Sequence, residues 1–415
     1  MPSRAAGTGL SQNREPFSAL ALRRKYGIFS ERGLALYATG IGGGFIVGLA
    51  AQLFGFAKRY ENGNCIDFVW LWLSSHFAAS SLPVRVYDYA AFSAAKTALL
   101  GPSGCILEHF DYPPTLLFFV YPLHLLPYGI AFAVWIAATL GIYLMAVYLI
   151  IPHRNALLVA CTIYPAWINI LIGHDGFLTA GLMGLALAWA ETRPRVAGIF
   201  LALLSYKPQF GILFPSSLAL SRNWRMLIAA TTASILFAAI AGYVFGYETW
   251  PAFLHALSER ASALSENRGS AKPLVSVLFL LSLGVSSELV WTFQLAIAAV
   301  AASAVCLVWA RPYPYALKAA SLATGTLIVS PHVISYDVCM LAIGTAFFVK
   351  DGLERGFRRG ERATLLVCWL VLHRFVIGPA PMIVCSILLG LTVLRALRCP
   401  AGEQVQTGGL EETPA

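Results

Sequence analysis

Residues 128–150 read YGIAFAVWIAATLGIYLMAVYLI and contain no charged side chain. A helix needs about 20 consecutive apolar residues to cross the hydrocarbon core of a bilayer. This run therefore predicts a membrane-spanning helix, and the rest of the chain is interpreted as that of a membrane protein.

The whole chain shares this apolar character. Of its 415 residues, 58% are hydrophobic and only 12% are charged, and the mean hydropathy is +0.70. A soluble domain has about a quarter charged residues. The net charge of +9 does not indicate nucleic acid binding, because the Lys and Arg residues are scattered between apolar runs. The composition predicts an all-α polytopic membrane protein.

Similar apolar runs recur along the chain and predict about twelve spans. Two apolar pieces, 113–127 and 273–285, would reach only roughly 20 Å as helices, so they are expected to be interfacial or re-entrant. Proline interrupts a helix, so a broken hairpin is expected at Lys207-Pro208. The predicted spans are 34–56, 128–150, 155–172, 176–190, 195–206, 208–220, 225–247, 288–310, 315–330, 331–349, 363–378 and 380–396.

The distribution of Lys and Arg predicts the topology. Cytoplasmic loops carry an excess of these residues, and this rule places both termini inside. It gives a basic cytoplasmic tail at 1–33, one transmembrane domain at 34–396, and a polar, disordered cytoplasmic tail at 397–415. The large first loop at 57–127 and a second segment at 248–287 then lie outside. The loop at 248–272 is interpreted mainly as a solvated connector, and the alternative is that its Arg260, Arg268 and Lys272 cover an anionic substrate.

The first external loop contains an unusual stretch, NCIDFVWLWLSSHFAASSLPVRVYDYAA at 64–91. Asp67 stands there among apolar residues, and partial desolvation makes a carboxylate a better proton acceptor. The alternative is that Asp67 caps a helix. Capping is the favoured interpretation of Asp88, before a helix predicted at 89–100, although Asp88 and Arg85 are also candidates for contacting a substrate.

Two further motifs are expected on the same side. Tyr112 begins Tyr-Pro-Pro, which predicts a rigid rim at the start of a short helix. Gly173-His174-Asp175-Gly176 joins two spans, and its glycines allow a tight turn that brings His174 and Asp175 together. The motif is interpreted either as a plain turn or as part of a site.

Lys207, in SYKPQF, is the most informative cation, because a lysine in an apolar hairpin is costly and needs a charged partner. A lipid-linked phosphate would suit it, and snorkelling to the interface is the alternative. In the predicted span 331–349, His332 and Tyr336 are four residues apart and would share a helix face. Asp337 is expected to face the bundle interior.

The eight cysteines show neither CxxC nor a Cys/His ligand spacing. We therefore expect no metal site and no cofactor. Cys65 and Cys105 fall in one external segment, where a disulfide is left open.

In their order and spacing, these motifs resemble glycosyltransferase family 87, the polyprenol-phosphate-mannose-dependent transferases of the GT-C superfamily. The resemblance implies a GT-C-like bundle, a periplasmic active site, a lipid-phosphate sugar donor, and Asp67 as general base. It rests on Asp67-Phe68 with Tyr87-Asp88, YPPTLLFFVYPLHLLPY at 112–128, GHDGFLTA at 173–180, RPRVAGIFLALLSYKPQFGILFP at 193–215 and SPHVISYDVCML at 330–341.

The expected reaction is an inverting transfer of a hexose, mannose by resemblance, from polyprenyl phosphate to an acceptor hydroxyl. Lys207, together with His332, would stabilise the departing phosphate. The acceptor is left open among a glycolipid, a polysaccharide and a protein. The expected location is the inner (plasma) membrane, with the lipid bilayer as a partner. The alternative is a transporter or lipid flippase that uses Lys207 and Asp337 in a substrate pathway.

Overall fold

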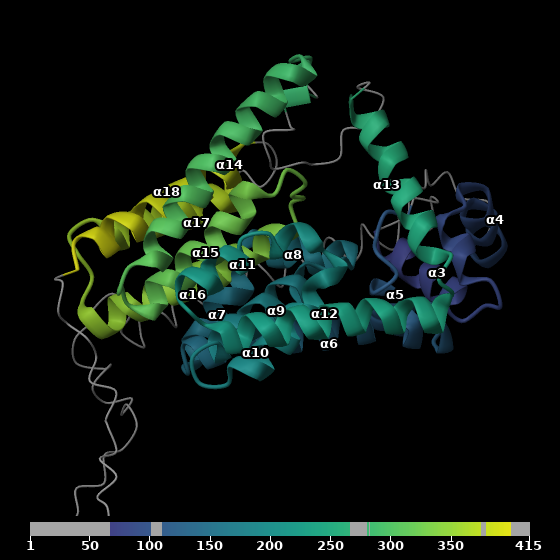
Figure 1. The fold of residues 1–415 in the computed structure, drawn as a ribbon, viewed down its shortest axis with the longest axis horizontal. Coiled ribbons are helices and arrows are strands. Elements are labelled where there is room, and N and C mark those ends of the chain that lie inside the picture. The colour runs from purple at the N-terminus through teal and green to yellow at the C-terminus, as the bar shows by residue number, and fades with distance from the viewer. Residues whose placement is uncertain (1–66, 101–109, 266–279, 282, 375–378, 400–415) are drawn as a thin grey trace, which may run out of the picture.

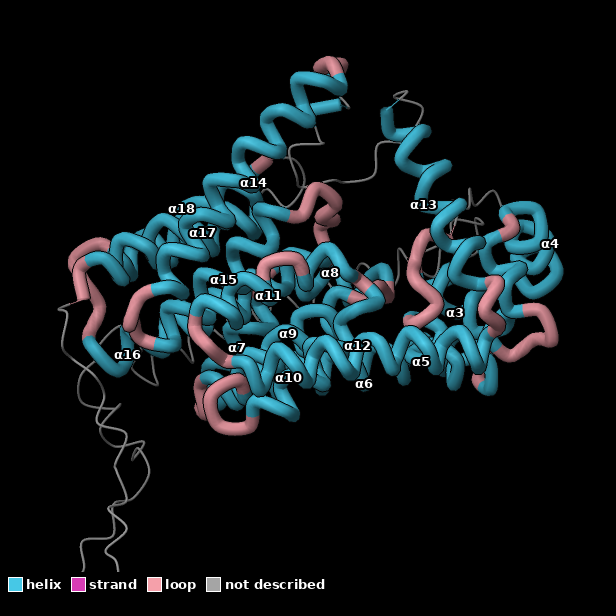
Figure 2. The backbone as a smooth tube through the Cα atoms, in the orientation of Figure 1, coloured by secondary structure: helices cyan, strands magenta, loops and turns pink. Residues whose placement is uncertain are grey.

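The computed structural model describes residues 67–100, 110–265, 280–281, 283–374 and 379–399. All regular secondary structure in these ranges is helical (Figure 2). The predicted span at 34–56, the tail at 1–33, most of the tail from 397 and both Cys65 and Cys105 fall outside the described residues.

Four of the described helices are long and apolar enough to cross a membrane. Their bounds agree closely with the predicted spans, because each is an apolar run without a charge cluster and without a proline beyond its first turn. They are α6 (Tyr128–Ile150), α12 (Trp224–Phe245), α14 (Ser287–Ala310) and α18 (Ala380–Leu397). The chain is therefore a helical membrane protein, while the predicted number of spans is left as a prediction.

A fifth span is obtained if α7 (Arg154–Thr162) and α8 (Tyr164–Ile172) are counted together. The sequence predicted one continuous helix at 155–172, but the two segments are bent by 69°. Pro165 lies in the first turn of α8. Its ring cannot supply a backbone N–H and would clash with the preceding helical turn, so the helix breaks just before it.

Two shorter helices form the centre of the bundle. Every residue from Gly176 to Leu187 in α9 (Gly176–Trp189) is buried, as is every residue from Ala319 to Ile328 in α15 (Tyr315–Val329). Helix α9 contacts α6, α10 (Pro194–Leu203) and α16 (Met340–Arg355), whereas α15 contacts α14, α16 and α18. A Cβ at Gly181 would collide with Ile142, so this glycine lets α6 approach α9 closely.

The predicted break at Lys207-Pro208 is present. Helix α10 (Pro194–Leu203) ends in the 3-10 turn η4 (Leu204–Tyr206), and η5 (Pro208–Gly211) then leads into α11 (Phe214–Leu220). Lys207 lies between the two 3-10 turns, where the chain is not continuously helical.

Buried ion pairs join the last three helices at the opposite end of α16 from the candidate site. Arg395 on α18 donates to Asp351 on α16 (Met340–Arg355) at 2.5 Å and to Glu361 on α17 (Glu361–Arg374) at 2.6 Å. Asp351 is fully buried and Arg395 is 4% exposed. Arg355 supplies a second cation, with its Nε 3.2 Å from Oδ1 of Asp351, so the two carboxylates are balanced by two guanidinium groups.

The described part of the segment predicted to be the first external loop lies together with α13 at one end of the molecule (Figure 1). The part predicted as a connector begins with helix α13 (Thr249–Ser265), because Phe253 and Ala256 are three residues apart and bury one face of it. That helix contacts η2 (Pro83–Tyr87). The other elements here are α3 (Phe68–Ala78), α4 (Tyr89–Leu100), α5 (Leu116–Val120) and η3 (Tyr121–Leu125).

Candidate active site

Lys207 is the centre of a buried ionic cluster. Its Nζ donates to Oδ1 of Asp175 at 2.7 Å and to Oδ1 of Asp337 at 2.6 Å. The three residues are 3%, 0% and 2% exposed, respectively. All three lie where helices are interrupted: Asp175 just before α9, Lys207 between η4 and η5, and Asp337 in the 3-10 turn η7 (Asp337–Cys339). The sequence predicted that Lys207 needs a charged partner, and the structure supplies two from the protein itself.

Two glycines allow the Asp175 turn to form. Gly173 has φ +72°, and a Cβ there would collide with Phe132 and with the Cβ of Phe68. Gly176 packs against the carbonyl oxygen of Tyr336, which a Cβ would also strike. The glycines of the predicted Gly-His-Asp-Gly turn therefore do two things. They let the chain reverse direction, and they leave room for neighbouring segments to pack directly against the backbone of the turn.

An aromatic stack lies beside the cluster. The His174 ring lies 3.9 Å from the Tyr336 ring at an interplanar angle of 11°, and Lys207 Nζ is 4.9 Å from the Tyr336 ring centre. His174 Nδ1 lies 2.7 Å from Oδ1 of Asp175 and 2.9 Å from its backbone nitrogen. A protonated Nδ1 donates to the carboxylate, whereas an unprotonated one accepts from the N–H. His174 can therefore exchange one contact for the other without moving.

The cluster holds two carboxylates and one ammonium group. Burial alone would raise the pKa of Asp175, but the charges of Lys207 and His174 outweigh burial and hold this pKa below its usual value. The Oδ2 atom of Asp175 is buried without a hydrogen bond, whereas Oδ2 of Asp337 accepts from the backbone N–H of Ile334 at 3.1 Å. The ammonium charge of Lys207 is thus compensated by two carboxylates of the protein itself.

Tyr112 forms one wall of the same region. Its ring centre is 5.8 Å from Lys207 Nζ, and its side chain hydrogen-bonds with Tyr336. The Tyr87 hydroxyl donates to the Tyr112 carbonyl at 2.8 Å and ties this segment to η2. Burial, followed by the nearby Asp175 charge, raises the pKa of Tyr112 well above its usual value. Its phenol is therefore protonated and can donate a hydrogen bond.

Asp67 lies at the edge of this region, immediately before α3. It is half-buried, and its side chain does not cap the helix. The capping alternative for Asp67 is therefore not realised. The next residue, Phe68, abuts Gly173, and the Asp67 charge acts on the Tyr336 hydroxyl. Asp67 is consequently placed near Tyr336, one of the two rings of the aromatic stack.

The segment that carries His332 differs from the prediction. Residues 331–336 are not helical, and α16 begins only at Met340. Proline disfavours a helical conformation in the residue before it. The Asp337 carboxylate accepts a hydrogen bond from the backbone N–H of Ile334, which stabilises a loop here in place of a helix. His332 and Tyr336 therefore do not share a helix face. His332 is half-buried in the loop, whereas Tyr336 is 3% exposed.

The remaining candidates lie away from the cluster. Asp88 is exposed, and its Oδ1 accepts from the backbone N–H groups of Ala90 and Ala91 at 2.9 and 3.2 Å. It caps α4, as its position in the sequence favoured. Arg85 is exposed on η2. A substrate role for Asp88 and Arg85 stays a prediction.

Sequence analysis missed one organising residue, Asn169. It is fully buried, and its Nδ2 donates to the Tyr336 carbonyl at 2.9 Å and to the Pro165 carbonyl at 3.0 Å. The backbone carbonyl oxygen of Asn169 accepts from the Gly173 N–H. Asn169 thus joins α8, the Gly173 turn and the Tyr336 loop. The signal was present, since an amide in the apolar segment PAWINILI needs a partner.

No group of three or more His, Cys, Asp or Glu residues that could hold a metal ion occurs in the part of the chain that the structure describes. What these residues offer instead is a half-buried carboxylate, protonated tyrosine hydroxyls, histidine side chains and a buried ionic cluster. Such a set can accept a proton and hydrogen-bond a polar substrate.

Comparison with protein families gives one match, to glycosyltransferase family 87 over residues 110–331, which is more than half of the chain. The matched region contains Tyr112, His174, Asp175 and Lys207, while Asp67 lies before it. Comparison with curated proteins and with solved structures gives no significant match. The extent of the family match shows that the chain belongs to glycosyltransferase family 87, so it is a membrane glycosyltransferase by family.

Proposed function

We propose that this protein transfers a hexose from a polyprenyl-phosphate-linked donor to an acceptor hydroxyl, with inversion at the anomeric carbon. The observation that carries the proposal is the state of Asp67. Its half-buried carboxylate is not used as a helix cap, and it lies beside a rigid site built from four separate segments. Family membership supports the transferase chemistry.

In the proposed reaction, Asp67 accepts the proton of the acceptor hydroxyl. The acceptor oxygen forms a bond to the anomeric carbon, the bond from that carbon to the phosphate oxygen breaks, and its electron pair leaves with the lipid phosphate. Attack from the face opposite the leaving group gives inversion. No covalent sugar–protein intermediate is required, so one carboxylate is sufficient.

The developing phosphate charge needs a positive or hydrogen-bonding partner. Lys207 was the expected one, but its ammonium group already contacts both Asp175 and Asp337. We therefore assign Lys207 a positioning role: through its contact with Asp337 it holds the loop that also carries His332. His332, half-buried on that loop, is the group that faces the leaving phosphate in this proposal.

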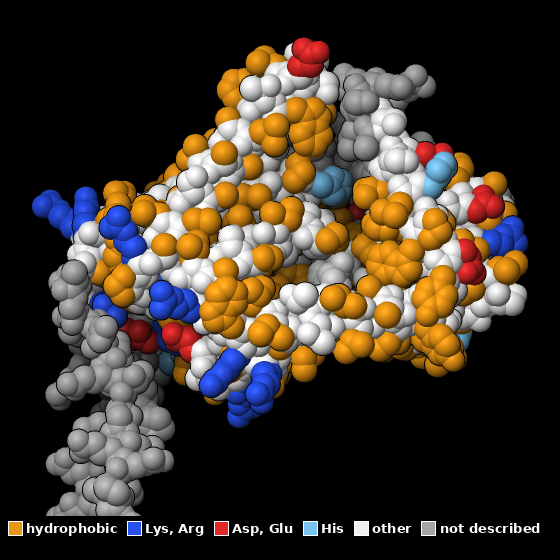
Figure 3. Space-filling view, in the orientation of Figure 1, with side chains coloured by type: hydrophobic (Ala, Val, Ile, Leu, Met, Phe, Trp, Pro, Cys, Tyr) orange, Lys and Arg blue, Asp and Glu red, His pale blue; other side chains and the backbone are white. Residues whose placement is uncertain are grey.

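The distribution of charge supports an active site on the periplasmic side of the inner membrane. Figure 3 shows apolar side chains over much of the visible face and most Lys and Arg side chains towards one end of the molecule. The candidate site adjoins the start of α3, where Phe68 abuts Gly173, and α3 lies towards the other end (Figure 1). Cytoplasmic segments carry the excess of positive residues, so the site would face outwards.

Mannose is the proposed sugar because the chain resembles mannose-transferring members of the family. The acceptor is a glycolipid, a polysaccharide or a protein. Membranes that contain the protein, supplied with polyprenyl phosphate carrying labelled mannose or labelled glucose, would identify the donor. Analysis of the labelled product by extraction would then identify the acceptor class.

The central test is Asp67→Asn, which keeps the size of the side chain and removes its basicity. We expect turnover to fall by about 10²-fold or more, with the protein still folded. Glu259→Gln, an exposed carboxylate on α13, is the matched control. Unchanged turnover in Asp67→Asn would exclude the proposed base. Movement of the lipid donor across reconstituted vesicles without a glycosyl product would instead support the transporter alternative.

A further inference from the structure

Four arginines are gathered at one end of the helix pair formed by α10 and α12. Arg193 and Arg195 lie at the start of α10, whereas Arg222 and Arg225 lie at the start of α12. All four residues are exposed, and together they are called the arginine surface below. Figure 3 shows Lys and Arg side chains at the end of the molecule where α10 begins.

The two halves of the arginine surface are fixed side by side. Asn223 Nδ2 donates to the carbonyl oxygen of Ala190 at 2.9 Å, which joins the turn before α12 to the turn before α10. A Cβ at Gly198 would collide with Ala229 and with the backbone of Ala230, so the two helices pack closely. The backbone therefore holds the two arginine pairs next to each other.

No described carboxylate balances these charges. The chain contains no Asp or Glu between Glu191 and Glu248, and Glu191 interacts electrostatically with Lys318 and Lys350. Among the described residues, none of the four arginines forms an ion pair with a carboxylate. Cations are also unfavourable at the start of a helix, which carries partial positive charge. Local helix stability therefore does not explain the arginines at these positions.

Arg222 also adopts a costly backbone conformation. Its φ is +57°, and it is the one non-glycine residue with a positive φ in the described ranges. It ends α11 at a position that glycine usually occupies, with the next N–H donating back to the Leu218 carbonyl oxygen at 2.9 Å. An arginine kept at such a position despite the strain indicates that its side chain has a function.

The arginine surface lies where a spanning helix leaves the apolar region. Helix α12 is apolar enough to cross a membrane and begins at Trp224. Trp224 stands between Arg222 and Arg225 and is 52% exposed. Tryptophan is enriched at the boundary between the hydrocarbon and the head groups. The four guanidinium groups would therefore lie at the level of the lipid phosphates.

We propose that the arginine surface binds the head group of an anionic phospholipid. A guanidinium group pairs with a phosphate through two parallel hydrogen bonds, so the four side chains can hold phosphate oxygens and lose their mutual repulsion. Cardiolipin has two phosphates for the two arginine pairs, and phosphatidylglycerol has one. The inference is independent of the proposed reaction, because it concerns a different end of the bundle.

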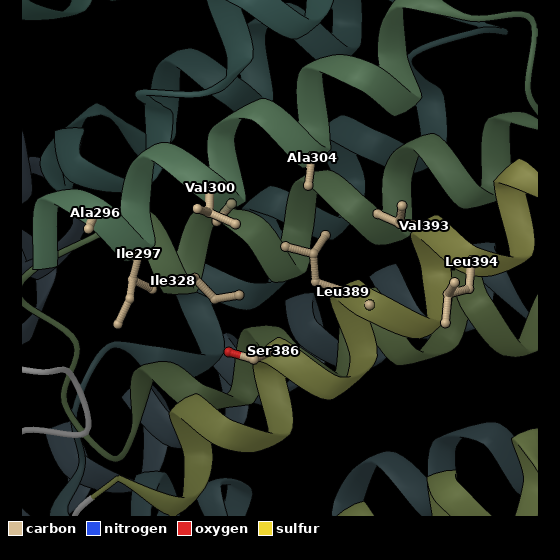
Figure 4. Close-up of a pocket in the computed structure, with 11 residues that line it drawn as sticks. Ala296, Ile297, Val300, Ala304, Ile328, Ser386, Leu389, Val393 and Leu394 are labelled. Atoms are coloured by element: carbon tan, nitrogen blue, oxygen red, sulfur yellow. The ribbon is translucent and has the colours of Figure 1, made fainter. Parts of the chain in front are cut away.

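The apolar groove between α14 and α18 illustrates the contrast. Figure 4 shows aliphatic side chains along this groove, and Ser386 is the labelled residue with a hydroxyl group. Such walls can contact hydrocarbon but offer a phosphate no positive group. Selection among head groups is therefore expected at the arginine surface.

The test is a double variant, Arg195→Gln with Arg222→Asn. It removes one charge from each half of the arginine surface, and asparagine tolerates the left-handed conformation at position 222. The matched control is Arg311→Gln with Arg359→Gln. Arg311 follows α14 and Arg359 precedes α17, and both are exposed. The control thus removes the same total charge from elsewhere on the protein.

The measurements are binding of cardiolipin, phosphatidylglycerol and phosphatidylcholine to the purified full-length protein by native mass spectrometry, and the Tm with each lipid. We expect cardiolipin to bind most tightly and phosphatidylcholine least. The double variant should bind cardiolipin about tenfold to thirtyfold more weakly, and the control should bind it nearly as the unmodified protein does. Cardiolipin should raise the Tm of the unmodified protein and the control more than that of the double variant.

Without added lipid, the double variant should be at least as stable as the unmodified protein, because repulsion and strain are both reduced. Three results would overturn the proposal. Equal weakening of cardiolipin binding in the double variant and the control would show that only total charge matters. Equal binding of cardiolipin and phosphatidylcholine by the unmodified protein would exclude head-group recognition. If inorganic phosphate raised the Tm as much as cardiolipin does, the surface would be a site for a soluble anion.

Discussion

The ammonium group of Lys207 lies 2.7 Å from Oδ1 of Asp175, and both side chains are buried within the bundle. With Asp337 as the second partner, the lysine joins three interruptions of the helical fold. Removing one partner from a buried ion pair leaves an uncompensated charge, which costs far more than the pair contributes when intact. The cluster is therefore expected to be sensitive to any change in its charge balance.

Lys207→Met should destabilise the protein by about 3–5 kcal/mol, because it leaves two buried carboxylates without their cation. Thermal unfolding of the detergent-solubilised protein measures this loss. Arg225→Met, at an exposed position on α12, is the control and should have little effect. A stable Lys207→Met protein with lost donor binding would contradict the positioning role and restore Lys207 as a direct ligand of the phosphate.

Asp175→Asn should show a pH-dependent loss of stability. The pKa of Asp175 is held below its usual value in the folded protein, so its ionised form stabilises the fold at pH values above the unfolded pKa, about 3.9. That stabilisation disappears as the pH falls towards the folded-state pKa. We expect the difference in Tm between the unmodified protein and Asp175→Asn to be constant near neutral pH and to shrink below about pH 4. A difference that is already lost at pH 6 would show that Asp175 is not held ionised.

Asp88→Ala should destabilise α4 by about 1 kcal/mol, because the backbone N–H groups of Ala90 and Ala91 lose their acceptor. Asp88→Asn keeps an oxygen at the cap and should restore most of the stability. Glycosyl transfer should be near normal in Asp88→Asn. If that variant folds as the unmodified protein does but binds donor poorly, Asp88 has the substrate role that its place in the predicted first external loop also suggested.

Gly176→Ala should lower turnover by about a hundredfold, because its Cβ would displace the Tyr336 carbonyl and the Asn169 side chain. Gly211→Ala, in η5, is the control, since a Cβ there meets nothing within 4 Å. Comparable activity in the two variants would show that the close approach of the Tyr336 loop to α9 is not needed for catalysis.

The long membrane helices could be predicted from sequence because their signal is local. Uninterrupted apolar runs gave the bounds of α6 and α18 almost to the residue. The prediction was wrong at 331–349, where apolar composition concealed a loop held open by Pro331 and by the contact from Asp337 to Ile334. Hydropathy indicates whether a segment is surrounded by lipid and protein or by water. It does not distinguish a helix from a buried loop.

The site was predictable in part for a related reason. A charge in an apolar segment needs a partner, which identified Lys207 from its neighbours alone. The identity of the partners was not accessible, since Asp337 is 130 residues away in the chain. Asn169 and the stack of His174 on Tyr336 likewise depend on how α8 meets the loop before α16. Only the assembled bundle brings these groups together.

The order of the three charged residues along the chain has a consequence for synthesis. Asp175 precedes Lys207 by 32 residues, so the lysine enters the membrane with an anionic partner already made. Asp337 follows much later. Nascent chains fold from the N-terminus. Asp175 and Lys207 are therefore synthesised and can pair first, and Asp337 completes the cluster when it is synthesised later. A polypeptide truncated before Asp337 would therefore insert with its lysine neutralised, yet without the contact that closes the bundle.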